Sequence, residues 1–240
     1  MTEEATESRI VYTFTFADGR KKQFVVRLDH ATLSRIAEPR DAYPAWTALG
    51  HEKCPNCPLD EASHPRCPVA RNLVDVVEAF RDEISYDEVA VEVETGERSY
   101  RKTAPLQEGL AALIGSVTVT SGCPVLDRLR PMVDTHLPFM SPEESTYRMI
   151  TMHLLAQYFR VRRGETPDWS LDELVRLLAE CRVTNAALVR RVQTLGFKDA
   201  SLNALARLNT MGEITALSID GDLERLAGIF GSHDSRPRPS

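Results

Sequence analysis

Hydrophobic and polar residues alternate along two segments in the first half of the chain. Over residues 9–28, β-branched and aromatic residues alternate with polar ones on both sides of Asp18-Gly19. This pattern predicts a β-hairpin, because Asp-Gly accepts the positive φ of a type I′ turn. A similar alternation over residues 87–103 predicts a second hairpin. Together the two hairpins predict a four-stranded antiparallel sheet.

Apolar residues at helical spacing predict a helix over residues 68–83 between the hairpins. Pro68 stands at its first position, where proline is favoured, so Cys67 is the predicted N-cap. We expect this helix to cover the apolar face of the sheet. A second short helix is predicted at 106–113, and the pattern beyond Gly115 fits both a strand and a helix.

From residue 122 onward the pattern is helical throughout. Ser141 and Ser170 each begin a capping box, in which a glutamate follows three residues later. Polar residues around His153 form one strip of the helix after Ser141, so His153 is expected to be solvated. The tail at 233–240 is predicted to be disordered from its composition. The predicted helices cover 124–133, 142–163, 171–181, 184–195, 200–211 and 220–230.

These elements predict an α+β fold for the chain of 240 residues. An N-terminal part, residues 1–120, is expected to contain the two β-hairpins, a helix and a Cys/His metal-binding loop at 51–68. A C-terminal part, residues 121–232, is expected to be all-helical and to pack on it. This length accommodates one large domain or two small ones.

The predicted metal-binding loop contains the main candidate chemistry. Cys54 and Cys57 form a C-x2-C pair, and His64 and Cys67 form an H-x2-C pair shortly after it. Thiolate and imidazole are the ligands that zinc prefers, and two such pairs can complete a tetrahedron. The spacing therefore predicts a structural Zn²⁺ site, a zinc knuckle. His51 stands three residues before the first cysteine and is an alternative ligand.

An iron–sulfur cluster is the alternative interpretation of the same cysteines. A cysteine followed by proline is frequent in ferredoxin-type sequences. Four of the five cysteines precede a proline, namely Cys54, Cys57, Cys67 and Cys123. In this interpretation Cys123 would be the fourth ligand, and His64 would be a neighbour of the cluster.

A redox dithiol is a third interpretation, because Cys54-Pro-Asn-Cys57 resembles the active-site tetrapeptide of glutaredoxin-like proteins. Such a motif lies between a buried strand and a helix, whereas residues 44–53 do not have a strand pattern. Haem binding through a thiolate is also compatible with a Cys-Pro dipeptide, but several close together favour a metal knuckle. Cys181 ends an apolar helical pattern and is expected to be a small core residue.

The composition, with 42% hydrophobic and 27% charged residues, is that of an ordinary soluble globular protein. No apolar run reaches the roughly 18 residues of a membrane span. An odd number of cysteines and an acidic, polar N-terminus predict a cytoplasmic protein. The net charge is −6, so nucleic acid is not an expected partner. Positive charge gathers only in the middle of the chain, at Arg128, Arg130, Arg148, Arg160, Arg162 and Arg163.

The sequence therefore predicts a metal-binding protein with an interaction or regulatory role, in which the zinc is structural. The helical part is expected to bind a protein partner through its arginines. The alternative is an iron–sulfur or thiol redox protein that uses the same cysteines. No Ser/His/Asp set, Walker loop or G-x-G-x-x-G motif is present, which favours a non-enzymatic role.

Overall fold

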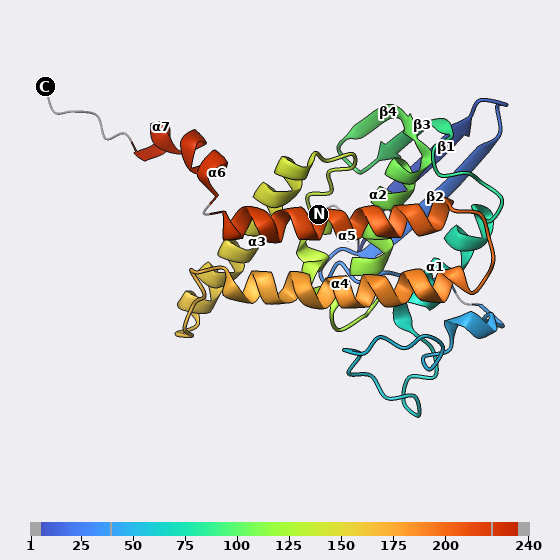
Figure 1. Ribbon diagram of the computed structural model, residues 1–240, viewed down its shortest axis with the longest axis horizontal. Coiled ribbons are helices and arrows are strands. Elements are labelled where there is room, and N and C mark those ends of the chain that lie inside the picture. The colour runs from blue at the N-terminus through green and yellow to red at the C-terminus, as the bar shows by residue number, and fades with distance from the viewer. Residues whose placement is uncertain (1–5, 39, 222, 235–240) are drawn as a thin grey trace, which may run out of the picture. The chain divides into compact units, whose positions relative to one another are not determined.

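The structure, a computed structural model, describes residues 6–38, 40–221 and 223–234 (Figure 1). Within these residues it contains a four-stranded antiparallel sheet followed mostly by helices, so the predicted α+β class is confirmed. The chain divides into two compact units, and each is built from two separate segments. Unit 1 comprises Met1–Phe139 and Glu180–Thr210, and unit 2 comprises Met140–Ala179 and Met211–Ser240.

The sheet lies in unit 1 and has the strand order β2-β1-β3-β4. Both predicted hairpins are confirmed, and β1 pairs with β3 to join them. The predicted type I′ turn is wrong. Such a turn requires a positive φ at both central residues, whereas Gly19 has a positive φ of +84° and Asp18 does not. The strands are β1 (Glu7–Phe16), β2 (Lys21–Asp29), β3 (Glu88–Glu94) and β4 (Ser99–Pro105).

Two helices cover the apolar face of this sheet, α1 (Pro68–Ala79) and α2 (Leu106–Val119). At Gly109 the α2 backbone approaches so closely that a Cβ atom would lie 2.7 Å from the Val91 side chain. Phe80 is the residue at which α1 ends. Its ring packs edge-on against the Phe14 ring, with centroids 5.1 Å apart. The predicted helix over the sheet is therefore present, and α2 shares its role. α2 also continues through residue 115, so the segment that fitted both strand and helix is helical.

The remaining elements differ from the predicted helices mainly at their ends. Residues 172–193 form one helix where two were predicted, and the helix that begins at residue 200 continues through Gly212 to residue 220. The segment after Cys123 is a 3₁₀ helix that contains Pro131. These elements are η1 (Ala45–Thr47), η2 (Leu126–Val133), α3 (Pro142–Arg162), α4 (Asp172–Gln193), α5 (Ala200–Asp220), α6 (Glu224–Ile229) and α7 (Gly231–Asp234).

Of the two predicted capping boxes, one is confirmed. The Ser141 side chain accepts from the Glu144 N–H, and the Glu144 carboxylate accepts from the Ser141 N–H. The box predicted at Ser170 is wrong, because the Glu173 N–H donates to Asp168 Oδ2 at 2.7 Å. Ser170 instead donates its hydroxyl proton to Asp168 at 2.7 Å.

Helix α3 buries polar residues and exposes apolar ones. His153 and Gln157 are only 7% and 3% exposed, whereas Leu155 and Phe159 are more than half exposed. The prediction that His153 is solvated is therefore wrong. The polar side chains are buried because they have partners: His153 Nε2 lies 3.3 Å from Asp168 Oδ2, and Gln157 accepts from the Asp168 N–H at 3.0 Å.

No helix in the described part of the chain is long and apolar enough to cross a lipid bilayer. The tail predicted to be disordered, 233–240, lies outside the described residues from 235 onward, and residues 233 and 234 belong to α7.

Candidate metal centre

The two ends of the cysteine loop, residues 51–68, are joined by main-chain hydrogen bonds. The Leu49 N–H donates to the Pro65 carbonyl at 3.1 Å, and the Cys67 N–H donates to the Thr47 carbonyl at 2.8 Å. These bonds join the chain before the loop to the chain at its end. The loop is therefore closed at its base by main-chain hydrogen bonds.

Three cysteines of the loop lie at positions fixed by the backbone. The Cys57 N–H donates to the Cys54 carbonyl at 3.0 Å, so Pro55 and Asn56 form a tight turn between the two cysteines. Cys67 is the N-cap of α1, as predicted, and its side chain makes no capping hydrogen bond. Its thiol thus remains available at the start of the helix.

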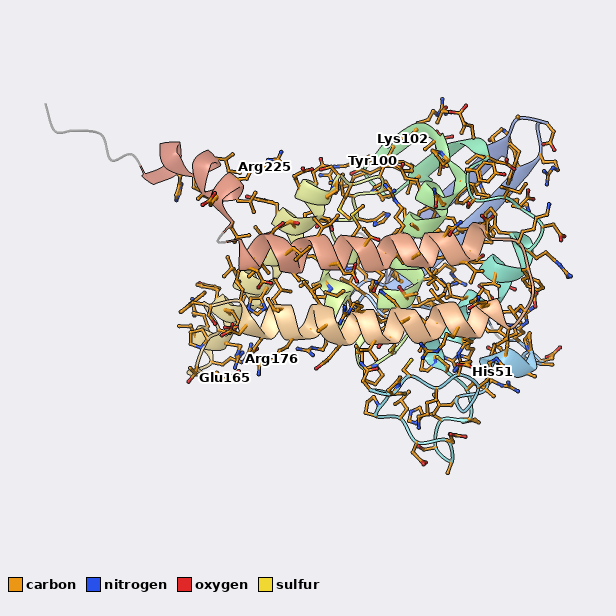
Figure 2. All side chains as sticks on the ribbon, in the orientation of Figure 1. His51, Tyr100, Lys102, Glu165, Arg176 and Arg225 are labelled. Carbon is orange, nitrogen blue, oxygen red and sulfur yellow. The ribbon has the colours of Figure 1, made fainter. Side chains whose placement is uncertain are left out.

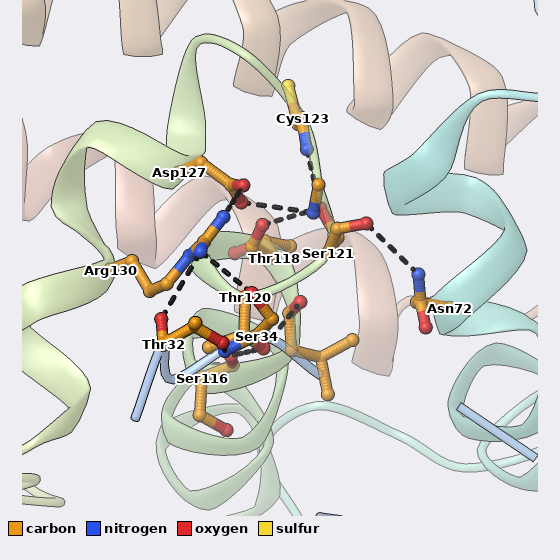
Figure 3. A network of polar contacts seen from close by, with 12 residues as sticks. Thr32, Ser34, Asn72, Ser116, Thr118, Thr120, Ser121, Cys123, Asp127 and Arg130 are labelled. Atoms are coloured by element: carbon orange, nitrogen blue, oxygen red, sulfur yellow. Dashed lines mark hydrogen bonds and ion pairs between the residues drawn. The ribbon is translucent and has the colours of Figure 1, made fainter. Parts of the chain in front are cut away.

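Cys123 reaches the same region from a distant part of the sequence. Asn72, in the first turns of α1, donates to the Ser121 carbonyl at 3.4 Å (Figure 3). The Ser121 hydroxyl in turn accepts from the Cys123 N–H at 3.3 Å. Because Cys67 caps α1, these contacts place the segment that contains Cys123 beside the end of the cysteine loop.

The thiols of Cys54 and Cys123 are influenced by the other cysteines that precede prolines. Burial, with smaller contributions from the thiols of Cys67, Cys123 and Cys57, raises the pKa of the Cys54 thiol to about 12. Burial also raises the pKa of Cys123; backbone N–H groups at the next residues oppose this, and the thiols of Cys67 and Cys57 add to it. Unit 1 therefore gathers these four thiols into one neighbourhood.

Two histidines near the thiols have other partners. His64 is exposed, and its Nδ1 lies 3.0 Å from the Ser63 hydroxyl. His51, labelled in Figure 2, places its Nε2 3.0 Å from the hydroxyl of Thr194, the residue after α4. In the recorded side-chain positions of the described residues, no three His, Cys, Asp or Glu groups are close enough to hold a metal ion. A zinc site through His64 stays a prediction.

Arg191 of α4 binds the base of the cysteine loop from inside unit 1. Its side chain is almost completely buried, with 1% of the residue exposed. One guanidinium nitrogen, Nη1, donates to the carbonyls of Trp46 and Ala48, each at 2.6 Å, and Nη2 donates to the Leu49 carbonyl at 3.3 Å. These bonds hold the backbone just before the loop.

Groups of the cysteine loop act on the pKa of Arg191. Burial lowers the pKa of its guanidinium, and the thiols of Cys67 and Cys54 act in the opposite direction, followed by Glu52 and Cys57. Glu52 is itself bound to a second arginine, Arg190, at 3.3 Å. A buried cation is costly unless an anion accompanies it. Arg191 in turn lowers the pKa of the Cys54 thiol, but burial outweighs it and keeps that pKa above its usual value.

The C-x2-C turn of the loop also contacts α4. The Asn56 amide donates to the Glu180 carbonyl at 3.0 Å, and Cys54 Sγ lies 3.9 Å from the Thr184 carbonyl. One helix therefore contacts the loop at its base and at its C-x2-C turn.

A family model described as a domain of unknown function, DUF6901, matches residues 10–231. The chain belongs to this family. The matched region includes the sheet, the cysteine loop and α1 to α5. No curated protein and no solved structure matches the chain.

The sequence reasoning missed Arg191, although the DUF6901 chain contains a signal for it. Leu188 and Val192 are apolar and lie on one side of α4 at helical spacing, and Arg191 falls between them. A charged residue at a buried position of an amphipathic helix requires a partner. The same spacing correctly predicts Cys181 as a core residue, which is buried and whose pKa burial raises to about 12.

Proposed function

We propose that this protein binds a metal ion in its cysteine loop, that the metal is zinc, and that its role is structural rather than catalytic. The observation that supports this most is that hydrogen bonds within unit 1 hold together the segments that carry Cys54, Cys57, Cys67 and Cys123. The thiols of Cys57, Cys67 and Cys123 also act on the pKa of Cys54. Clustered thiolates are the ligands that zinc and iron–sulfur centres use.

The cysteine loop has little else to stabilise it. Between Lys53 and Pro65 its side chains are exposed or half-buried, and Leu59 is the only large aliphatic residue among them. Its contacts are hydrogen bonds at the base and to α4. A bound metal would supply the missing energy, since a structural zinc site contributes on the order of 10 kcal/mol to folding.

An iron–sulfur cluster is the second candidate. The proximity of Cys123 favours it, because four cysteines are then available without a histidine. We place either centre in the cytoplasm, where thiols remain reduced, since all five cysteines are unpaired.

Removal of the metal tests the structural role. A strong chelator, or Cys57→Ser, should lower the melting temperature and increase amide exchange in the cysteine loop. The matched control is Cys181→Ala, which removes a buried thiol outside the loop and should cost only about 1 kcal/mol. Equal effects of Cys57→Ser and Cys181→Ala, with no effect of the chelator, would contradict the proposal.

We further propose that unit 2 binds a protein partner through α3. Large exposed apolar residues are normal singly, but several together mark interaction sites. The exposed ones on α3 are Tyr147, Leu155, Tyr158, Phe159 and Val161. The arginines of α3 and the residue after it contribute less to this surface, because they are paired with carboxylates. Arg160 pairs with Glu173 at 2.8 Å, and Arg163 pairs with Glu165 at 2.6 Å.

Substitutions on α3 separate the two versions of this surface. In a pull-down, Leu155→Ser with Phe159→Ser should abolish capture of the partner if apolar contacts dominate. Loss of capture in Arg160→Ala/Arg163→Ala, with strong salt dependence, would favour the charged version. Capture that neither pair of substitutions changes would contradict a partner site on α3.

A further inference from the structure

We infer that Cys123 is the fourth ligand of the proposed centre in place of His64, and that Arg191 is its buried counter-charge. The inference rests on the proposed function, because it specifies the ligands of that metal. It makes the centre a four-thiolate site that joins the cysteine loop, the segment after α2 and the C-terminal half of α4.

The position of Cys123 supports its role as a ligand. The side chain of Asn72 joins α1 to the Ser121 carbonyl, two residues before Cys123. After Cys123, the Asp127 N–H donates to the Cys123 carbonyl at 2.9 Å. The Asp127 carboxylate accepts from the Gly122 N–H at 3.0 Å and pairs with Arg130 (Figure 3). The backbone around Cys123 is thus fixed on both sides, as a metal ligand requires.

The fixed position of Cys123 is reinforced from the sheet side of unit 1. Arg130 donates to the Ser34 hydroxyl at 2.9 Å and to the Thr32 carbonyl at 3.3 Å (Figure 3). These contacts connect the turn after β2 with the 3₁₀ helix that follows Cys123. This network fixes the backbone that carries Cys123, which is the preorganisation that a metal ligand needs.

The surroundings of His64 are less suited to a metal ligand. His64 is exposed and hydrogen-bonded to its neighbour Ser63. A ligating histidine normally uses its second ring nitrogen to bind an acceptor that holds the ring in place. His64 would also have to turn from solvent toward the buried Cys67.

Arg191 accounts for the charge of the site. Four thiolates around a divalent ion leave two negative charges, and burial of such a charge requires compensation. The guanidinium lies buried beside Cys54, Cys57 and Cys67 and is held in place by three carbonyl oxygens. Arg191 is therefore a positioning residue that would stabilise four thiolates more than three.

Cobalt substitution distinguishes the two ligand sets. Metal-free full-length chain would be titrated anaerobically with Co²⁺, whose sulfur-to-metal charge-transfer absorption grows with the number of bound thiolates. We expect the intensity of a four-thiolate site in the wild type and in His64→Gln. Cys123→Ser should lose roughly a quarter of that intensity and bind Co²⁺ at least about tenfold more weakly. The control is Cys181→Ser, which changes a buried thiol that lies near Cys123 but is not a proposed ligand. It should bind Co²⁺ as the wild type does.

The outcomes separate this inference from the proposed function. If the wild type binds no Co²⁺ or Zn²⁺, the proposed function fails. If it binds metal but His64→Gln loses intensity while Cys123→Ser does not, the function stands and the inference is overturned. For Arg191, the charge-neutral Arg191→Gln should weaken Co²⁺ binding roughly tenfold, and Arg191→Lys should restore part of the loss. If folded Arg191→Gln and Arg191→Lys bound Co²⁺ equally well, the counter-charge role would be contradicted.

Discussion

The Asn56 side chain, between the two cysteines of the C-x2-C pair, donates a hydrogen bond of 3.0 Å to the main-chain carbonyl of Glu180. These residues are separated by more than half the length of the chain. The turn that presents Cys54 and Cys57 is therefore held by α4, and not by apolar contacts of the loop itself. Metal ligands can be preorganised in this way on a loop that has no core of its own.

Asn56→Ala should loosen this turn without unfolding unit 1. The variant loses the bond to Glu180, which contributes about 1 kcal/mol. We expect faster amide exchange in the cysteine loop, with unchanged exchange in the sheet. Ser63→Ala, on an exposed part of the same loop, is the control and should leave exchange at Asn56 unchanged. Identical exchange in the two variants would show that α4 does not hold the turn.

Gly109→Ala tests the packing of α2 on the sheet. An alanine Cβ would lie 2.7 Å from Val91 Cγ2 and 3.0 Å from Phe14 Cε1. Overpacking of this kind costs about 1–3 kcal/mol, which outweighs the helix-propensity gain of about 1 kcal/mol. Denaturant unfolding should therefore show a net loss of stability. Gly96→Ala, where nothing lies within 4 Å, should have little effect, and a stabilised Gly109→Ala variant would contradict the packing.

The buried polar side of α3 predicts an unusual pair of effects. Gln157→Ala should destabilise unit 2 by about 1–3 kcal/mol, because it leaves the Asp168 N–H without its acceptor. Leu155→Ser, at a side chain that is 56% exposed, should change stability by no more than about 0.5 kcal/mol. Amide exchange along α3 measures both. A larger loss of stability in Leu155→Ser than in Gln157→Ala would contradict the burial of Gln157 and the exposure of Leu155.

Glu83 should make unit 1 sensitive to acid. Burial alone would raise its pKa, but hydrogen bonds from Arg20 and Lys22, at 2.8 and 2.6 Å, outweigh burial and lower it. A lowered carboxyl pKa contributes stability above the unfolded-state value near 4.5, and this stability is lost as the pH falls through the folded-state value.

Glu83→Gln is therefore expected to cost about 2 kcal/mol at pH 7, and the difference from the wild type should shrink below about pH 4.5. Urea unfolding at several pH values measures this difference. Glu97→Gln, at an exposed position, is the control. A deficit that does not change with pH would contradict the ion-pair explanation.

The strands and most helix starts could be predicted from sequence because local signals determine them. Alternation around Gly19 predicts the first hairpin, and the capping box at Ser141 predicts the start of α3. Local patterns did not predict that residues 172–193 form one helix, because nothing in the sequence distinguishes a short break from a continuous helix. The buried polar side of α3 was missed because its partner, Asp168, lies outside the helix.

The candidate site was predictable only in part. The spacing of Cys54, Cys57 and Cys67 identifies three of the clustered thiols without any structure. The neighbourhood of Cys123 depends on the contact of Asn72 with Ser121, residues that are 49 positions apart. Such long-range contacts leave no local pattern. The burial of Arg191 is different, because the apolar residues around it at helical spacing do indicate a buried position.

Elemental analysis of anaerobically purified protein, combined with its absorption spectrum, tests the central claim most directly. The account predicts about one zinc per chain and a colourless protein, because a closed tetrahedral thiolate site binds a single ion. Cys57→Ser should reduce the bound zinc sharply, and Cys181→Ala should not. A brown protein that contains iron and sulfide would show that the centre is an iron–sulfur cluster and not a zinc site. A wild-type chain that contains neither metal and takes up no zinc when it is added would contradict the account.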